Sequence, residues 1–275
     1  MSADPVALCL AGRLSPEVTL ARLLLAGQSP DDIAARLEGE SGPRAGELRA
    51  LVATRRDALR QLGSVFAEVS HDETGLDAVR RLFDRAVARA PEASVAAYSL
   101  NDPAILAAAT GELVAWVDGE GLLRAEYDVL DLGCGIGRVA AAIAPRVRSV
   151  LGLDVSAAMI AEAERRCAAA NLRFAAIDGT GLDVLQDSTV DLVLAVDSVP
   201  YLLQAGVAEA HMRDIARVLR RGGTLAILNL SYRNDPALDS ADLAHWAEAY
   251  DMAITADGIA PFKLWDGRGF VLRKP

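Results

Sequence analysis

A glycine-rich turn that directly follows a short apolar run is the feature that most constrains this chain. Residues 129–132 read Val-Leu-Asp-Leu, and glycines follow at positions 133, 135 and 137. Such an apolar run indicates a strand covered on both faces, and the alternate glycines leave a turn whose backbone a ligand can approach closely. Helical spacing begins at Arg138. The strand, turn and helix together predict a ligand site at the carboxyl end of a parallel sheet.

The second half of the chain repeats this alternation of strand and helix. Apolar runs predict strands at 129–132, 149–153, 172–177, 190–196 and 224–230, with helices at 138–144, 157–170, 207–219 and 239–250. Two last strand-like runs, at 253–259 and 269–273, are too close for a crossover helix, which predicts an antiparallel hairpin at the sheet edge. The order predicts the α/β class, with a doubly wound, mostly parallel seven-stranded sheet of Rossmann-like type.

The first half of the chain has helical apolar spacing from residue 14 to about 118. Ser-Pro pairs at 15–16 and 29–30 are typical of helix starts. We expect one long amphipathic helix whose apolar side runs from Leu48 to Val69, and further helices at 77–89 and 103–117. The predicted domains are an N-terminal helical cap at 1–120, which covers the substrate or forms a homodimer, and a ligand-binding domain at 121–275.

Charge and cysteine content narrow the function classes. The formal net charge is -10, from 38 acidic and 28 basic residues, and such a surface repels phosphate backbones. We therefore expect no nucleic-acid partner. The three cysteines are far apart, no run is apolar enough to span a membrane, and the histidines lack metal-ligand spacing. These features predict a cytoplasmic protein without a metal site or a membrane partner.

Acidic residues at the tips of the predicted strands indicate which ligand the turn holds. The dinucleotide fingerprint requires a third glycine where this chain has Arg138. Asp154 ends the second strand, 21 residues beyond Gly133, where a carboxylate can accept hydrogen bonds from both ribose hydroxyls; a helix-start acid is the alternative. Asp178 ends the third strand, where it can bind an adenine amine or form a turn with Gly179.

These ordered features resemble a class I S-adenosylmethionine-dependent methyltransferase over about residues 96–275. The resemblance also rests on the fourth strand at 191–197 and on the Arg-Arg-Gly-Gly segment that leads into the fifth. It implies S-adenosylmethionine as cofactor, with the methionine moiety on the glycine loop, the ribose at the second strand and adenine at the third. The cofactor-binding residues that it implies are Asp131, Gly133, Cys134, Gly135, Gly137, Asp154, Val155, Met159, Asp178, Gly179 and Asp197.

The tip of the fourth strand is where we expect the methyl acceptor. Asp197 could act as a base, hold a cationic amine, or only position the cofactor through its backbone, and Tyr201 could form a wall and take part in catalysis. The tip also has a likeness to the motif of amine-directed nucleic-acid methyltransferases, but Val199 interrupts the pair of prolines. Weaker candidates for substrate contact are Tyr98, Asn101, Tyr232 and His245.

The sequence therefore predicts an enzyme that transfers a methyl group from S-adenosylmethionine to an oxygen or nitrogen of a small molecule. The acidic strand tip slightly favours an amine acceptor. Two alternatives stay open. One is a catalytically silent cofactor-binding or scaffold protein, and the other is a nicotinamide-dependent oxidoreductase, which Arg138 disfavours.

Overall fold

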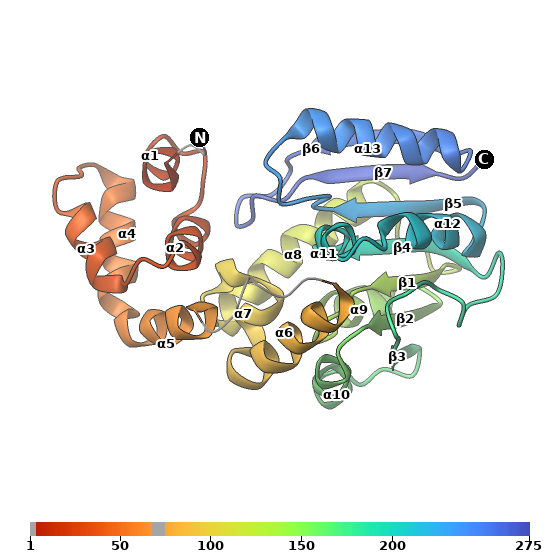
Figure 1. Ribbon diagram of the computed structural model, residues 1–275, viewed down its shortest axis with the longest axis horizontal. Helices are drawn as coiled ribbons and strands as arrows, with labels where there is room; N and C mark the ends of the chain where they lie inside the picture. The colour runs from red at the N-terminus through yellow and green to blue at the C-terminus, as the bar shows by residue number, and fades with distance from the viewer. Residues whose placement is uncertain (1–3, 68–74) are drawn as a thin grey trace. The chain divides into compact units, whose positions relative to one another are not determined.

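The computed structural model describes residues 4–67 and 75–275, which form two compact units (Figure 1). One unit contains the described residues before 68, together with Arg85–Glu112 and Phe262–Asp266. The other contains residues 75–84, Leu113–Pro261 and Gly267–Pro275. The units interleave along the chain, whereas the sequence predicted one boundary at residue 120. The functional division into a cap and a ligand-binding domain stays a prediction.

A seven-stranded sheet forms the centre of the second unit and confirms the predicted fold class. Its strands run in the order β3-β2-β1-β4-β5-β7-β6. β1 to β5 are parallel, β7 pairs antiparallel with β5, and β6 pairs antiparallel with β7, so the expected hairpin is present. The strands are β1 (Asp128–Leu132), β2 (Ser149–Asp154), β3 (Leu172–Ala176), β4 (Val190–Val196), β5 (Leu219–Leu228), β6 (Ala253–Ile259) and β7 (Gly269–Arg273).

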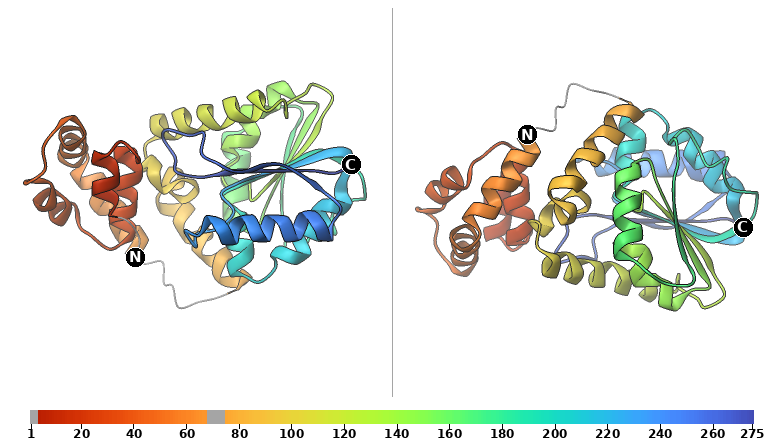
Figure 2. Two further views of the ribbon diagram at one scale, coloured as in Figure 1. Left: turned by 90° about the horizontal axis from the view of Figure 1, so that it is seen from above. Right: turned by 90° about the horizontal axis from the view of Figure 1, so that it is seen from below.

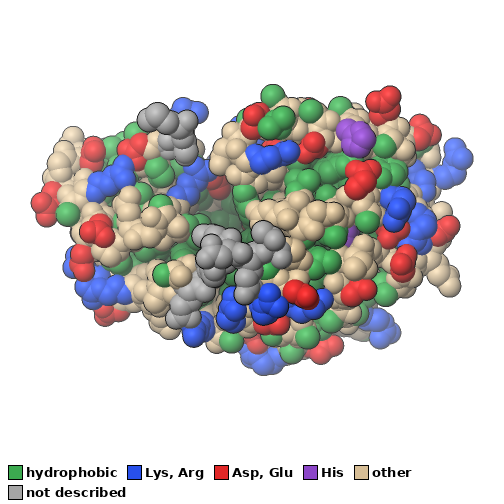
Figure 3. Space-filling model, viewed as in Figure 1, with side chains coloured by type: hydrophobic (Ala, Val, Ile, Leu, Met, Phe, Trp, Pro, Cys, Tyr) green, Lys and Arg blue, Asp and Glu red, His purple; other side chains and the backbone are tan. Residues whose placement is uncertain are grey.

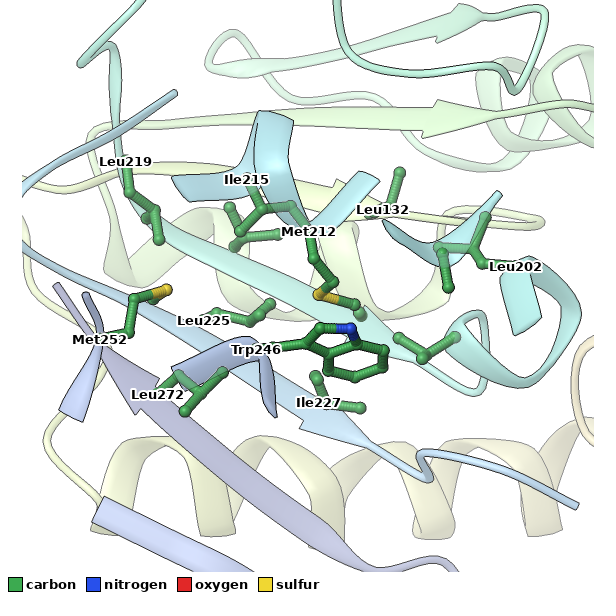
Figure 4. Close-up of a cluster of buried hydrophobic side chains, with 14 of the residues drawn as sticks. Leu132, Leu202, Met212, Ile215, Leu219, Leu225, Ile227, Trp246, Met252 and Leu272 are labelled. Atoms are coloured by element: carbon green, nitrogen blue, oxygen red, sulfur yellow. The ribbon is translucent and has the colours of Figure 1, made fainter. Parts of the chain in front are cut away.

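Helices cover both faces of this sheet (Figure 2). Right-handed crossovers place α9 (Arg138–Ile143) and α10 (Ala157–Arg166) on the face opposite α12 (Ala208–Val218) and α13 (Pro236–Ala249). On the latter face, side chains from α12 and α13 pack against the strands in a buried cluster (Figure 4). Members drawn there include Met212, Ile215, Leu225, Ile227, Trp246 and Leu272. The core is thus largely aliphatic, as the low aromatic content requires.

The regular secondary structure described in the first unit is helical, but the prediction of one long amphipathic helix there is wrong. The chain breaks at Arg55, which separates α4 (Pro43–Thr54) from α5 (Arg56–Ala67), and Arg55 forms an ion pair with Asp102. Val69, the last expected apolar position, lies outside the described residues. The unit's other helices are α1 (Pro5–Leu10), α2 (Pro16–Leu25), α3 (Pro30–Leu37), α7 (Pro91–Val95) and the single turn η1 (Ala97–Ser99).

Two element boundaries differ most from the prediction. α10 ends at Arg166 instead of residue 170, and β5 begins at Leu219, because the segment expected to lead into the strand already pairs with β4 at Val190. The short helix α11 (Val199–Gln204), just after β4, was not predicted. Two helices span both units: α6 (Leu76–Arg89) and α8 (Pro103–Gly119). The sequence had assigned α6 wholly to the helical cap.

Candidate active site

Adjacent strands β1 and β4 lie at the point where the strand order reverses. From β1 the chain proceeds to β2 and β3 on one side, and β4 then leads to β5 on the other. Ligands of open α/β sheets bind beyond the carboxyl ends of the strands at such a position. The glycine loop follows β1 and Asp197 follows β4, so the fold brings both predicted parts of the site to the same sheet edge.

The glycine loop has the backbone that its glycines predicted. Gly133, Gly135 and Gly137 all have positive φ, at 74°, 54° and 76°. The N–H groups of Gly133 and Cys134 both donate to the carbonyl of Leu153, at 2.8 and 3.0 Å, which fixes the loop to the end of β2. Residues with a Cβ adopt this backbone conformation only with strain, so the loop requires glycine at these positions.

Asp131 supports the loop from within the core. The residue is buried, and its Oδ2 accepts a hydrogen bond from the Ala140 N–H at 3.1 Å in the first turn of α9. Gly137, which precedes α9, has no side chain that could cap the helix, so the strand supplies the acceptor. Burial raises the pKa of Asp131 to about 7. Asp131 is therefore placed to stabilise the loop and the start of α9.

Asp154 holds the other side of the loop. Its Oδ2 accepts the Gly135 N–H and its Oδ1 accepts the Ser156 N–H, each at 2.9 Å. The side chain is buried, and desolvation raises its pKa. A carboxylate oxygen has two lone pairs, so these backbone bonds leave acceptor capacity for ribose hydroxyls. Ribose binding stays a prediction, and a structural role in the loop accompanies it.

Cys134, Val155 and Met159 complete the predicted cofactor-binding set. The Cys134 Sγ lies 2.9 Å from the position that a Cβ on Gly152 of β2 would occupy, and burial raises the pKa of this thiol. A Cγ atom of Val155 lies 2.6 Å from the position that a Cβ on Gly179 would occupy. Met159 is buried in the first turn of α10. Contact of these residues with the cofactor stays a prediction.

Asp178 forms a turn after β3. Its Oδ1 accepts hydrogen bonds from the N–H and the hydroxyl of Thr180, both at 2.9 Å, and these bonds lower the pKa of the exposed carboxyl group. Gly179 follows with a φ of 84°. The turn-forming alternative considered for Asp178 is therefore present, and adenine contact through the remaining oxygen stays a prediction.

Asp197 has a strained backbone at the tip of β4. Its φ is 56°, unusual for a residue with a Cβ, and its N–H donates to the Leu228 carbonyl at 2.7 Å. Its Oδ1 accepts a hydrogen bond from Nδ2 of Asn229 at 2.7 Å, and Asn229 itself has a φ of 72°. Asp197 and Asn229 thus both have a left-handed backbone at the ends of neighbouring strands, and their side chains are hydrogen-bonded. Such backbone strain is typical of functional sites.

Aromatic rings surround this carboxylate. The Tyr201 ring meets Tyr232 edge to face at a centroid distance of 5.5 Å and meets Phe83 at 4.9 Å. Burial, with Asp197 nearby, raises the pKa of Tyr201 to about 12. The Tyr232 residue is 42% exposed, but burial of its hydroxyl beside Asp197 and Tyr201 also raises its pKa well above the usual value. Both phenols are therefore protonated at neutral pH and can donate hydrogen bonds.

Helix α6 contributes contacts that the sequence did not reveal. Arg80 donates from Nε to the Val155 carbonyl and from Nη2 to the Asp178 carbonyl, each at 3.2 Å. Asp84 accepts a hydrogen bond from the Ser156 hydroxyl at 2.5 Å. With Phe83 against Tyr201, one helix contacts the segments after β2, β3 and β4. An amphipathic pattern predicts the helix, but no local signal identifies its partners.

The four predicted substrate residues have different surroundings. Tyr232 lies beside Tyr201. Tyr98 and Asn101 belong to the first unit, where Tyr98 is buried against Trp265 at 6.1 Å and Asn101 accepts the Ala93 N–H at 3.4 Å. His245 is exposed on α13, with its Nε2 3.7 Å from Glu209. Substrate contact stays a prediction for all four.

One buried polar atom at this edge has no partner. The Ser198 Oγ is inaccessible to solvent and, within the described residues, has no hydrogen-bond partner. It lies against the glycine loop, 3.3 Å from the position of a Cβ on Gly133. The backbone of the loop itself, which three glycines leave without side chains, fits a polar ligand such as the amino-acid end of S-adenosylmethionine.

Comparison with known proteins decides which family this site belongs to. Residues 129–223 match the family model of a methyltransferase domain. The chain contains a class I S-adenosylmethionine-dependent methyltransferase domain. This confirms the resemblance stated from the sequence, and the cofactor of the family is the one it implied. The match covers β1 to the start of β5 and thus both strand tips of the site.

Relatives of the methyltransferase domain differ in what their names describe. An O-methyltransferase from Pyrenophora dematioidea is 32% identical over 136 residues, 47% of this chain and 49% of that protein. The cypemycin N-terminal methyltransferase of a Streptomyces species is 33% identical over 133 residues, 48% of this chain and 52% of that protein. The chain spans between about a third and about a half of the curated relatives it matches.

Solved structures agree with the fold of the methyltransferase domain. Magnesium protoporphyrin IX methyltransferase from Synechocystis, solved with bound S-adenosylmethionine, is 16% identical, with a TM-score of 0.55. The alignment covers 75% of this chain and 100% of that one. At this identity the likeness supports the fold alone.

Membrane-spanning helices and clustered metal ligands are both absent from the described residues. No described helix is both long and apolar enough to cross a membrane. Across residues 4–67 and 75–275, no three His, Cys, Asp or Glu side chains gather as a metal site would require. On the face drawn in Figure 3, basic and acidic side chains are interspersed.

Proposed function

We propose that this protein transfers a methyl group from S-adenosylmethionine to an oxygen or nitrogen atom of a small molecule. The observation that supports it best is the convergence of two groups at one sheet edge. These are the glycine loop held by Asp154 and the Asp197 carboxylate beside Tyr201 and Tyr232. The net charge of -10 favours a small acceptor over a nucleic acid.

The chain's own residues suggest how the transfer is assisted. S-adenosylmethionine supplies an electrophilic methyl group on a sulfonium. Asp197 is placed to accept the proton of an alcohol or an ammonium acceptor, or to hold the acceptor in line. Asn229 orients the carboxylate through its 2.7 Å hydrogen bond. Tyr201 and Tyr232, both protonated at neutral pH, are suited to donate hydrogen bonds and to exclude water, not to act as bases.

Cofactor binding is tested by isothermal titration with S-adenosylmethionine and its demethylated product, S-adenosylhomocysteine. Asp154→Ala is expected to weaken binding strongly, but loss of the hydrogen bonds from Asp154 to the loop would by itself also weaken binding. A product analogue that lacks one ribose hydroxyl separates the two roles. If Asp154 binds ribose, the missing hydroxyl weakens binding to the wild type and has no further effect on the variant's residual affinity. An equal penalty in both proteins would leave Asp154 a purely structural role.

Methyl transfer is tested with labelled S-adenosylmethionine and a panel of small amines and alcohols. Asp197→Asn is expected to lower kcat about a hundredfold or more while affinity for S-adenosylhomocysteine stays within about twofold. An affinity loss with unchanged kcat would favour the positional role. No transfer across the panel, together with a stable complex with another protein in cells, would favour the silent scaffold protein. Binding of a nicotinamide dinucleotide in place of S-adenosylmethionine would restore the oxidoreductase alternative.

We also propose that the helical residues before 120 cover the acceptor or form a homodimer. The mass of the protein in solution, measured by light scattering, tests the dimer directly. A monomer at all concentrations would leave only the covering role.

A further inference from the structure

Tyr232 has its polar end buried and its ring exposed. The residue is 42% exposed, yet burial of the hydroxyl, with Asp197 and Tyr201 nearby, raises its pKa well above the usual value. The hydroxyl also forms hydrogen bonds with Tyr201 and Asp197. The exposed part of this side chain is therefore the aromatic ring. Because the ring is anchored at its polar end, it loses little conformational freedom when a ligand binds against it.

Two further rings form an aromatic wall with Tyr232. Tyr201 contacts both Tyr232 and Phe83, with ring centroids 5.5 and 4.9 Å away and interplanar angles of 81° and 76°. The three residues come from separate elements, since Phe83 lies in α6, Tyr201 in α11 and Tyr232 after β5. An edge-to-face contact uses at most one face of a ring. The Tyr232 ring therefore has a face that this wall does not use.

The Asp197 carboxylate adds a negative charge beside the aromatic wall. The residue is half-buried, and its Oδ1 accepts the 2.7 Å hydrogen bond from Asn229. An ionised carboxylate has about four lone-pair positions, so these hydrogen bonds leave acceptor capacity for a ligand. The face of an aromatic ring also attracts a cation that lies within about 6 Å of its centroid. A partly exposed carboxylate and an exposed ring thus favour the same kind of group, an organic cation.

The acid–base properties of the cluster also favour an amine over an aliphatic alcohol. Tyr201 and Tyr232 are protonated at neutral pH, which leaves the Asp197 carboxylate as the base. An ammonium group is a much stronger acid than an alcohol and gives up its proton to a weak base more readily. The acceptor nitrogen loses one proton to Asp197 and bonds to the methyl carbon, while the electron pair of the broken carbon–sulfur bond stays on sulfur. The methylated nitrogen again carries a positive charge, so one site suits the acceptor and its product.

We infer that the methyl acceptor is a cationic amine whose ammonium group binds between the Asp197 carboxylate and the exposed ring of Tyr232. This rests on the proposed function and selects nitrogen over oxygen as the atom that is methylated. Tyr232 determines specificity through its ring, and its hydroxyl fixes the position of that ring.

The test compares choline with 3,3-dimethyl-1-butanol, two probes of the same shape that differ by a quaternary nitrogen in place of a carbon. This nitrogen has no proton to lose, so the comparison measures the effect of positive charge alone. Dissociation constants are measured by NMR titration into the full-length protein saturated with S-adenosylhomocysteine. Choline is expected to bind at least about tenfold more tightly than the neutral probe.

Two substitutions of Tyr232 separate its ring from its hydroxyl. Tyr232→Leu keeps an apolar side chain but removes the ring, and it is expected to weaken choline binding by about fivefold to thirtyfold. The matched control is Tyr232→Phe, which keeps the ring and should bind choline within about twofold of the wild type. Both variants should bind S-adenosylhomocysteine within about twofold of the wild type. Among matched amines and alcohols supplied with labelled S-adenosylmethionine, the wild type should methylate the amines.

Several results would overturn the inference. These are equal affinity of the wild type for choline and the neutral probe, equal affinity of Tyr232→Leu and Tyr232→Phe for choline, and methyl transfer to alcohols alone. Parallel losses of choline and S-adenosylhomocysteine affinity in Tyr232→Leu would give Tyr232 a purely structural role. If the wild type does not bind S-adenosylhomocysteine, the proposed function itself fails. That outcome is distinct from one in which S-adenosylhomocysteine binds and choline does not.

Discussion

At Gly133 the left-handed backbone and the close approach of another strand tip coincide. Its φ is 74°, and the space where a Cβ would lie is occupied by Ser198. Gly206 has nearly the same φ, 73°, but nothing lies within 4 Å of its Cβ position. The two glycines thus separate the effect of backbone strain from the effect of contact.

We predict that Gly133→Ala lowers the free energy of unfolding by about 2 to 4 kcal/mol, and Gly206→Ala by about 1 kcal/mol. Only the first substitution adds a steric clash to the strain, and only it should also weaken S-adenosylhomocysteine binding. Urea unfolding and calorimetry on both variants measure this. Equal losses of stability would mean that Ser198 moves aside without cost.

Asp131 makes stability depend on pH in a direction opposite to that of an ion-paired acid. Burial raises its pKa from 3.8 to about 7, so the folded state retains a proton that the unfolded state releases near pH 4. Its contribution to stability is complete below about pH 4 and is lost as the pH rises to about 7. Each unit of pKa difference corresponds to about 1.4 kcal/mol.

Asp131→Asn removes the titrating carboxyl group, and the amide oxygen of the new side chain can still accept the hydrogen bond from the Ala140 N–H. We predict that the free energy of unfolding between pH 4.5 and pH 7.5 falls less in the variant than in the wild type, by a few kcal/mol. Urea unfolding of both proteins at the two pH values, without cofactor, provides the comparison. Parallel pH profiles would contradict the assignment.

Some site residues could be identified from sequence and others could not. The loop glycines and Asp154 could be identified because both occur at a fixed position after a predicted strand. The glycines there allow a left-handed backbone, and Asp154 accepts a hydrogen bond from the backbone of the loop. Asn229 carries no such signal, because its role depends on Asp197, 32 positions away. Tyr98 lies buried against Trp265, and its contact with the substrate stays a prediction.

Among the elements, α6 is a helix that the sequence predicted but whose contacts it did not predict. Its first part contacts the segments after β2, β3 and β4 through Arg80, Asp84 and Phe83. Arg80 donates to the carbonyl groups of both Val155 and Asp178, and so joins the segments that follow β2 and β3.

We predict that Arg80→Met, which keeps the aliphatic stem and loses both carbonyl contacts, increases amide exchange in residues 76–84 by about threefold to tenfold. The increase corresponds to about 1 kcal/mol, because the guanidinium is partly exposed. Hydrogen exchange read by mass spectrometry measures it, with Arg85→Met, an exposed position on the same helix, as control. An equal response to both substitutions would show that the two carbonyl contacts do not hold the helix.

The break between α4 and α5 could not be predicted either, because it does not disturb the spacing of the apolar residues. Val52 of α4 and Leu59 of α5 are both buried and seven residues apart, the spacing of one continuous helix. The interruption at Arg55, which pairs with Asp102, therefore leaves the apolar pattern intact. α11 is only six residues long, too short to give a periodic pattern. The strands β1, β2, β4, β5 and β7, by contrast, were predictable because extensive burial gives them continuous apolar runs.

For the whole molecule, the interleaving of the two units along the chain determines which N-terminal truncations leave the sheet-containing unit complete. The sheet-containing unit includes residues 75–84 and the end of α8, where Trp116 lies 2.9 Å from the Cβ position of Gly269 in β7. A cut at the predicted boundary of residue 120 would remove both parts.

We predict that a fragment of residues 121–275 is less stable than the full chain by several kcal/mol and binds S-adenosylhomocysteine at least tenfold more weakly. It would lose the buried contact of Trp116 and the contacts of α6. A fragment of residues 75–275 retains both and serves as the matched control. Urea unfolding and titration calorimetry of the two fragments make the comparison, and equal behaviour would show that the second unit is complete from residue 121.

The same interleaving bears on how such a protein diversifies. The chain passes between the units five times, between 67 and 75 and after Asp84, Glu112, Pro261 and Asp266. No single crossover between two genes could exchange the helical unit as one block, because Phe262–Asp266 is encoded far downstream of the rest. The two units are therefore expected to be inherited together.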